Sequence, residues 1–211
     1  MSKGTILEKI QNSCIPAPGA VTAVPIREYI RNEGDLLDNF IENIKANKAE
    51  VHECARSDVQ DLIIDIVRRT GCKKLFYPQG LFFDISSVAD VEGLEFNRSV
   101  NEIAEKLFAC DASILQARLG VSNLGLLCVT SSAYTPRLLS LLPTHCIMLL
   151  EKSAIVESLN DAFVEIKKEK SLPSNILFII GPSRTSDIEL QVVLGVHGPQ
   201  NVHVILYETD C

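Results

Sequence analysis

The stretch from Asn175 to Glu208, NILFIIGPSRTSDIELQVVLGVHGPQNVHVILYE, decides the fold class. Its first apolar run, Ile176–Ile180, has no polar interruption, which is typical of a strand buried on both faces of a parallel sheet. Gly181-Pro182 ends that strand and turns the chain. A second β-rich run, Val202–Leu206, closes the stretch. The separation of the two runs is long enough for a right-handed βαβ crossover.

The middle of this stretch predicts a short helix. Ser186 and Glu189 have the spacing of a capping box, in which the two side chains satisfy backbone donors of the first helical turn. Ile188 and Val192 give that helix one apolar side, and Gly195 is placed to end it. We therefore expect the order strand, polar turn, helix, turn, strand.

The polar turn carries the candidate chemistry. Ligands of open α/β sheets bind beyond the carboxyl ends of the strands, and a helix N-terminus attracts anions. Ser183, Arg184 and Thr185 are predicted to lie there, and a guanidinium with two hydroxyls suits a carboxylate or phosphate. In the alternative interpretation, the hydroxyls only cap and turn the chain, while Arg184 pairs with Asp187 or Glu189.

Two histidines and two glycines complete the candidate residues of this stretch. His197, followed by Gly198, either faces a ligand or is only hydrogen-bonded within its loop. Gly181 and Gly198 border the two turns. Both are included in the predicted ligand-binding set, together with Asp187 and Glu189. His203 lies among apolar neighbours in the second strand, so we expect it to be structural or edge-exposed.

The segments GPSRTSDIE (181–189), GVHGP (195–199) and NVHVILYE (201–208) closely resemble the C-terminal signature of the lactate-utilisation protein C family (LutC/YkgG, the LUD domain). The resemblance implies an α/β fold of three αβα layers with a mostly parallel sheet, similar to the NagB/RpiA/CoA-transferase-like group. It also implies a role in the oxidation of L-lactate to pyruvate. The partners implied are two further proteins, at least one of which carries iron–sulfur clusters.

A second stretch, residues 117–127, departs from the family pattern. The family sequence resembles ADFGIAETGTL, whereas this chain has ARLGVSNLGLL. Gly120 and Gly125 match, and a glycine here permits close backbone approach at the wall of a ligand site or simply forms a turn between strands. The changed positions are Arg118, Asn123, Leu124 and Leu126. The amide of Asn123 does not titrate, so it cannot replace a glutamate in acid/base chemistry. Asn123 and Gly125 remain candidate ligand-binding residues in a divergent family member.

Arg137 is a second candidate for holding an anion. It lies in the hydroxyl-rich segment Thr130–Leu142, which also resembles the family. The alternative is a structural salt bridge. His145 begins an apolar strand, His145–Leu150, and is expected to be structural.

The remaining pattern alternates helices and strands, which is typical of an α/β fold. Helices are expected after Asp35, after Ser57 (with Gln60 in a capping box), over Val100–Phe108 and after Ser153. Strands are expected at Val51–Cys54, Lys74–Tyr77 and Leu126–Val129, with short strands or loops from Leu81 to Arg98.

Composition restricts the class of protein. The chain has 211 residues, a formal net charge of −7 and no basic run, which argues against nucleic acid or an anionic membrane surface as a partner. No apolar stretch approaches the roughly 20 residues of a membrane span, and the N-terminus has no apolar signal core. We expect a cytoplasmic protein. Residues 1–34 are predicted to form a helical arm, either flexible or packed on a second subunit of a homodimer, and residues 35–211 a single α/β domain.

The cysteines argue against a metal centre in this chain. Seven are present, the nearest pair eighteen residues apart, whereas iron–sulfur and structural zinc sites usually use clustered thiolates. We therefore expect no metal and no cofactor here, with the clusters implied by the resemblance held by partner proteins.

Three functions follow from these observations. The first is a component of a lactate-oxidation system that binds a small anion and holds no cluster. The second is an isomerase, transferase or cyclo-ligase acting on a phosphorylated or CoA-linked substrate, although there is no Gly-x-x-x-x-Gly-Lys loop and no obvious catalytic pair. The third is a structural or regulatory homologue with a decayed site. We favour the first, and no catalytic residue is assigned.

Overall fold

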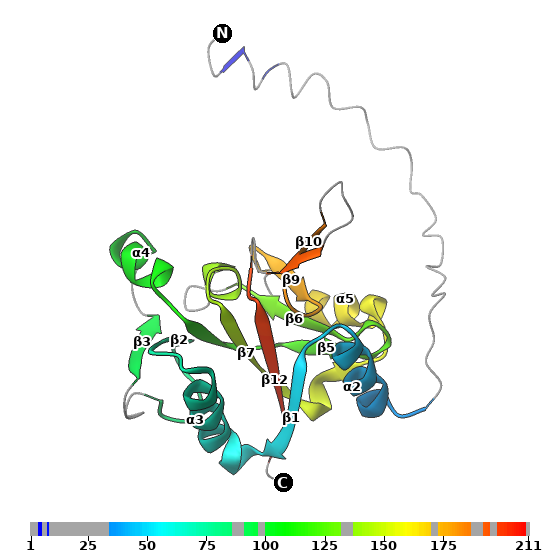
Figure 1. Cartoon of the computed structure of the whole chain (residues 1–211). Helices are drawn as coiled ribbons and strands as arrows, with labels where there is room; N and C mark the ends of the chain where they lie inside the picture. Colours follow the sequence, from blue (N-terminus) through cyan, green and yellow to red (C-terminus); the bar gives the residue numbers. More distant parts are fainter. Residues whose placement is uncertain are drawn as a thin grey trace.

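A parallel sheet forms the centre of the fold. The computed structural model describes residues 34–85, 91–96, 100–131, 137–169, 173–186, 192–194 and 198–209, together with residues 4, 5 and 8. Six strands of this sheet are hydrogen-bonded in the order β1 (Glu50–Ala55), β12 (Asn201–Glu208), β7 (His145–Glu151), β4 (Ala112–Gln116), β2 (Lys74–Pro78) and β3 (Glu92–Phe96), and every pair is parallel (Figure 1). The central strands are the most apolar because both of their faces are covered.

A second, smaller sheet packs beside the first. Its strands follow the order β8 (Ile155–Val156), β5 (Leu119–Val121), β6 (Leu126–Thr130) and β9 (Ile176–Ile179). β6 runs antiparallel to β5 and to β9, whereas β5 and β8 are parallel, so this sheet is mixed.

The elements are layered around three apolar clusters. Helix α3 (Val59–Thr70) covers one face of the main sheet. Helix α2 (Leu36–Ala46), the small sheet and α4 (Val100–Phe108) pack against the other face. Helix α5 (Leu159–Lys167) covers the outer side of the small sheet, so α3 and α5 lie on opposite sides of the two sheets (Figure 1). The predicted mostly parallel sheet is confirmed. The predicted αβα layering is incomplete, because a second sheet stands between the main sheet and α5.

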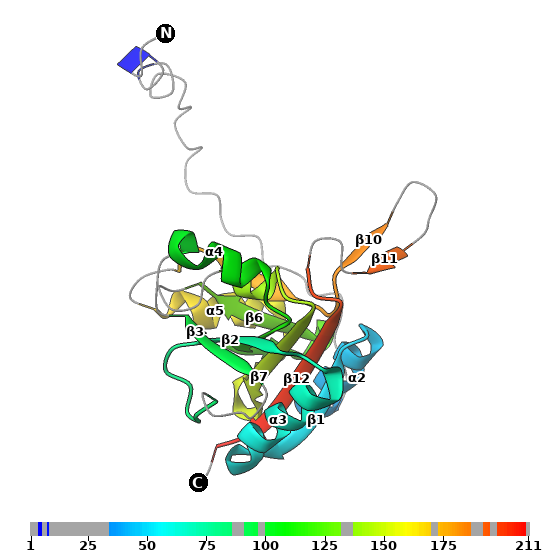
Figure 2. The ribbon, with the colours of Figure 1, turned by 60° about the vertical axis from the view of Figure 1, so that its left-hand side comes forward.

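The βαβ unit predicted over residues 175–208 is wrong. Strand β9 belongs to the small sheet and β12 to the main sheet. Ser186 ends strand β10 (Arg184–Ser186), which pairs antiparallel with β11 (Val192–Leu194), where a helix was expected. This hairpin projects away from the body of the domain (Figure 2). A helix of that length is marginal without packing, and the residues of β11 (VVL) are rich in β-branched side chains that favour a strand.

Helix ends were predicted with mixed success. Asp35 caps α2 as expected, accepting hydrogen bonds from the backbone N–H groups of residues 37 and 38, and Gly71 ends α3 in the left-handed conformation. Ser57 does not cap α3, because it lies in a 3-10 turn, η1 (Arg56–Asp58). Ser153 lies in another such turn, η4 (Lys152–Ala154), and Ser158 forms the capping box of α5.

The other expected strands and the helix α4 are present at the predicted places. Two further 3-10 turns, η2 (Ser122–Leu124) and η3 (Arg137–Ser140), follow β5 and precede β7. The predicted N-terminal arm lies almost entirely outside the described residues. No helix in the described part of the chain is long and apolar enough to cross a membrane.

Candidate functional site

A groove of about 360 Å³ lies against the turn that follows β9. One wall is the end of β9 and the turn, residues 177–184. The other lining residues lie in segments that precede three strands of the main sheet. They are Asn47 before β1, Ser140 and Leu141 before β7, and Gly198-Pro199 before β12. The groove therefore lies at the amino-terminal edge of the main sheet. The turn does follow the carboxyl end of β9, as expected. However, β9 belongs to the small sheet, so the turn does not lie at the carboxyl edge of the main parallel sheet.

Main-chain contacts position the turn. The N–H of Ser183 donates to the carbonyl oxygen of Pro199 over 2.8 Å, which joins the turn to the start of β12. Gly198 allows this approach, since a Cβ at that position would lie 2.9 Å from the Cβ of Ser183. Gly181 has φ +154° and lies against the main-chain oxygen of Asn47, where a Cβ would clash. Arg184 donates a hydrogen bond to that same oxygen.

The groove combines an apolar surface with one cationic end. Leucine, isoleucine, phenylalanine and proline side chains form most of its lining, and Ile180 is 45% exposed. Ser183 and the exposed Arg184 supply the polar end. Such a surface suits a small molecule that presents an anionic group beside an apolar portion.

The structure brings together four of the predicted ligand-binding residues, Gly181, Ser183, Arg184 and Gly198. Thr185 follows them on β10. Arg137 is the first residue of η3, the turn whose last residue, Ser140, lines the groove. The predicted residues Asp187, Glu189 and His197 lie outside the described part of the chain, as does the side chain of Arg137.

Asn123 and Gly125 belong to a different environment. Both are at the turn η2, and neither is among the described residues that line the groove. Gly125 has φ +61° and packs on α2, where a Cβ would lie 2.6 Å from the carbonyl carbon of Asn43. Asn123 is buried, and its N–H donates to the carbonyl oxygen of Glu157 over 3.1 Å. The close approach expected for a glycine here is thus to a helix.

The changed family positions near η2 have structural partners. Arg118 forms an ion pair with Glu169, and Leu126 is buried between the small sheet and α5. Leu124 is partly buried against the same cluster. These side chains therefore contribute to packing and charge pairing at the outer sheet.

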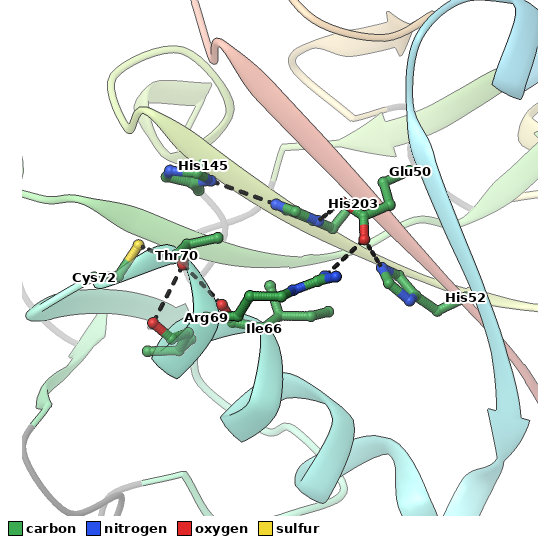
Figure 3. A network of polar contacts seen from close by, with 9 residues as sticks. Glu50, His52, Ile66, Arg69, Thr70, Cys72, His145 and His203 are labelled. Carbon is green, nitrogen blue, oxygen red and sulfur yellow. Dashed lines mark hydrogen bonds and ion pairs between the residues drawn. The ribbon is translucent and has the colours of Figure 1, made fainter.

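Some lining residues were not predicted from the sequence. Asn47, Ser140 and Pro199 reach the groove only because β1, β7 and β12 start at the same edge of the sheet. Nothing in their local sequence indicates a site. His203, predicted to be structural or edge-exposed, and His145, predicted to be structural, lie in a polar network on the α3 side of the sheet (Figure 3).

The cysteines that the structure describes have raised thiol pKa values. Burial raises the pKa of the Cys110 and Cys128 thiols to about 11 and that of Cys146 to about 12, and it also raises the pKa of Cys54 and Cys72. The neutral thiol is therefore the stable form of each at neutral pH.

Comparison with known proteins supports the resemblance noted in the sequence. The LUD domain family matches residues 37–207. Lactate utilization protein C of Bacillus licheniformis is 36% identical, with 88% of each chain covered. An uncharacterised protein of Neisseria meningitidis is 27% identical over 85% of this chain and 80% of its own. The YkgG protein of Escherichia coli is 35% identical over 46% of this chain and 44% of its own.

The fold also matches a solved structure. A DUF162 family protein from Deinococcus radiodurans superimposes with a TM-score of 0.57 at 19% identity, covering 82% of this chain and 96% of the other. This likeness concerns the fold alone. The family match spans most of the described domain, and the relative from Bacillus licheniformis aligns along nearly its whole length. The chain belongs to the LUD domain family, together with the lactate utilization protein C and YkgG proteins.

Proposed function

We propose that this chain is a component of an iron–sulfur-dependent system that oxidises L-lactate to pyruvate, and that it holds no cluster itself. The observation that carries the proposal is the 36% identity to a lactate utilization protein C with 88% of both chains aligned. Its proposed partners are iron–sulfur proteins of that system. We also propose that the protein is cytoplasmic. Residues 1–34 are proposed to pack on a second copy of the chain in a homodimer.

The cysteines support the absence of a cluster in this chain. Iron–sulfur clusters usually bind several clustered thiolates, whereas four of the five cysteines that the structure describes are buried. The nearest cysteines in the sequence are eighteen residues apart. We therefore assign the redox chemistry to the partner proteins.

The groove is the proposed ligand site. Arg184 and Ser183 would hold the carboxylate of a small anion, and the apolar wall from Leu177 to Ile180 would contact its carbon atoms. Lactate and pyruvate both have this chemistry. The proposed site is completed by Thr185, Asp187, Glu189, His197 and Arg137. Separately, the α/β fold is the basis on which we propose a relation to the NagB/RpiA/CoA-transferase-like group.

A second function has its own support. Leu126 is buried and Leu124 is partly buried in the cluster beneath α5, where the family pattern has hydroxyl side chains. Core packing at these positions favours a regulatory or structural homologue that binds partners without a small ligand. An enzyme acting on a phosphorylated or CoA-linked substrate is the remaining alternative.

Two experiments test the main proposal. The first is anaerobic affinity purification of the tagged protein from lactate-grown cells, combined with growth of a deletion strain on L-lactate. We expect iron–sulfur proteins in the purified material and a growth defect that the intact gene restores. Recovery of a colourless protein alone, with normal growth of the deletion strain on lactate, would contradict the assignment to lactate oxidation.

The second experiment tests the groove. L-lactate, pyruvate and phosphate are compared for their effect on the melting temperature, since binding to the folded state alone stabilises it. Arg184→Ala should abolish the shift, Arg184→Lys should retain part of it, and Arg68→Ala, an exposed arginine on α3, should leave it unchanged. A full shift in a folded Arg184→Ala protein would show that the anion binds elsewhere. No shift with any anion in the wild type would favour the homologue without a small ligand.

A further inference from the structure

A cluster of metal-binding residue types lies on the α3 side of the main sheet, separate from the groove lining. Glu50 and His52 are two residues apart on β1, so their side chains point to the same face. His203 is on the neighbouring strand β12, in register with Glu50. Figure 3 shows the three side chains converging, with Arg69 of α3 and His145 of β7 beside them. The sequence separates these elements by most of the chain, so only the sheet brings them together.

The candidate ligand atoms of the three side chains are close together, but their geometry does not fit hydrogen bonds. Nε2 of His52 is 3.2 Å from Oε1 of Glu50, and Nδ1 of His203 is 3.3 Å from Oε2. The three ligand atoms all lie within 4.8 Å of one another. Both ring nitrogens are buried, and neither has a hydrogen-bond partner among the described residues. Buried polar atoms nearly always have a bonding partner, so the two nitrogens indicate that a further group binds between them.

The spacing fits a tetrahedral ion. Bonds of about 2.0–2.1 Å to zinc place neighbouring ligand atoms roughly 3.3 Å apart. The separations of 3.2 Å and 3.3 Å match this value, although each involves a different oxygen of Glu50. With one ligand atom from each residue, all three atoms lie within 4.8 Å of one another, so a small rotation of the Glu50 carboxylate brings one oxygen to both imidazoles. Two imidazoles and one carboxylate form a donor set typical of Zn²⁺ and similar divalent transition metals. We propose that Glu50, His52 and His203 bind one such ion, through Oε of Glu50, Nε2 of His52 and Nδ1 of His203.

His145 supports the ligand geometry. Its Nδ1 lies 3.4 Å from Nε2 of His203. A proton on Nε2 of His203 can be donated to His145, which leaves Nδ1 of His203 free as a ligand. Ligating histidines commonly use their second nitrogen in this way to fix tautomer and ring orientation. His145 is thus a positioning residue for the site.

Exposure and charge determine how the ion enters and how tightly it binds. The side chain of His203 is 5% exposed, that of His52 17% and that of Glu50 46%, so the site opens to solvent on the side of Glu50. Three protein ligands leave the fourth position of a tetrahedral ion to water. Arg69 lies 2.6 Å from Oε1 of Glu50 and opposes the cation. We therefore expect replacement of Arg69 by Gln to tighten binding several-fold.

The experiment uses the full chain after removal of metal with a chelator. Zn²⁺ affinity and stoichiometry are measured by competition with a chromophoric chelator, and Co²⁺ is added in parallel for its visible d–d bands. We expect one ion per chain, and at least tenfold weaker binding in Glu50→Gln and in His52→Gln. His145→Gln should weaken binding without changing the stoichiometry. Glu53→Gln, an exposed glutamate on the same strand but the opposite face, is the matched control and should bind as the wild type does.

Two results would overturn the proposal. One is equal affinity in the wild type, Glu50→Gln and His52→Gln, with thiolate-to-cobalt charge-transfer bands, which would place the metal on cysteines. The other is no saturable Zn²⁺ binding by a folded wild-type chain, in which case Glu50 serves only its ion pair with Arg69. Circular dichroism of each variant without metal shows whether it is folded. Neither result affects the groove, whose ligands are different residues.

Discussion

The guanidinium of Arg184 donates a hydrogen bond to the main-chain oxygen of Asn47, which lies 137 residues earlier in the chain. Asn47 caps the C-terminus of α2, and its side-chain nitrogen donates to the carbonyl oxygen of Leu124 over 3.1 Å. One residue at the end of α2 therefore joins the polar end of the groove to the turn η2 of the small sheet. The turn after β9 and the turn η2 are thus both held at the same end of α2.

Replacement of Asn47 by Ala should lower the free energy of unfolding by about 1–2 kcal/mol, because the carbonyl of Leu124 loses its partner. Denaturation in urea measures this change. Lys45→Ala, an exposed change on the same helix, should stay within about 0.5 kcal/mol of the wild type. The partner of Arg184 is a main-chain oxygen, so any anion-induced thermal shift should survive in Asn47→Ala. Loss of that shift would mean that the amide itself contacts the anion.

Gly125→Ala should be far more destabilising than Gly71→Ala, although the two positions have similar φ values of +61° and +70°. Gly71 has nothing within 4 Å of an added Cβ, so its replacement should cost only the backbone strain, about 1 kcal/mol. At Gly125 the Cβ would meet the backbone of Asn43 and Ile44, and we expect a cost of more than about 3 kcal/mol. Equal costs, measured in urea, would show that η2 can move away from α2.

Replacement of two serines tests which residue caps the N-terminus of α5. Ser158 accepts a hydrogen bond from the N–H of Asp161, while the Asp161 side chain accepts from the N–H of Ser158. Ser158→Ala should therefore cost about 1 kcal/mol. Ser153 lies in the exposed turn η4 and contacts Glu151, so Ser153→Ala should change stability by less than about 0.5 kcal/mol. Thermal unfolding of both variants measures the two losses of stability. A larger loss in Ser153→Ala than in Ser158→Ala would indicate that Ser153 caps the helix.

Alkaline pH should destabilise the domain through its buried thiols. Burial raises the pKa of Cys128 from 9.0 to about 11. The unfolded chain therefore loses this proton first, so the stabilisation is fully present below pH 9 and is lost as pH rises through about 11. Between pH 9 and 10.5 we expect Cys128→Ala to lose roughly 1–2 kcal/mol less stability than the wild type. Cys54→Ala, at a half-buried position, is the control and should show a smaller difference. Parallel pH curves for the wild type and Cys128→Ala would contradict the raised pKa.

Local patterns correctly predicted most elements of the domain. Asp35 begins α2, Gly71 ends α3, and the apolar runs of β7 and β12 are buried strands, because capping, left-handed glycine and burial on both faces leave a direct mark on the sequence. The family itself was recognisable from residues 181–208, and the match over residues 37–207 confirms it.

The errors share one physical cause. Ser186 with Glu189 satisfies a short-range helix rule, but the pairing of Arg184–Ser186 with Val192–Leu194 makes a hairpin instead. Ser57 and Ser153 were likewise predicted to begin helices. Ser57 instead lies in the 3-10 turn directly before α3, and Ser153 lies in a 3-10 turn that β8 separates from α5. In each case the local preference is small compared with the free energy of packing.

The sequence by itself determined strands β1, β2, β6, β7, β9 and β12, most helices and the membership of the LUD domain family, since these depend on local periodicity and on residues close together in the chain. The tertiary structure alone decided which strands share a sheet. It placed the groove at the amino-terminal edge of β1, β7 and β12, and it brought Glu50, His52 and His203 into one cluster. Pairing between strands far apart in sequence is set by the burial of whole faces, a property of the folded chain that no local pattern contains.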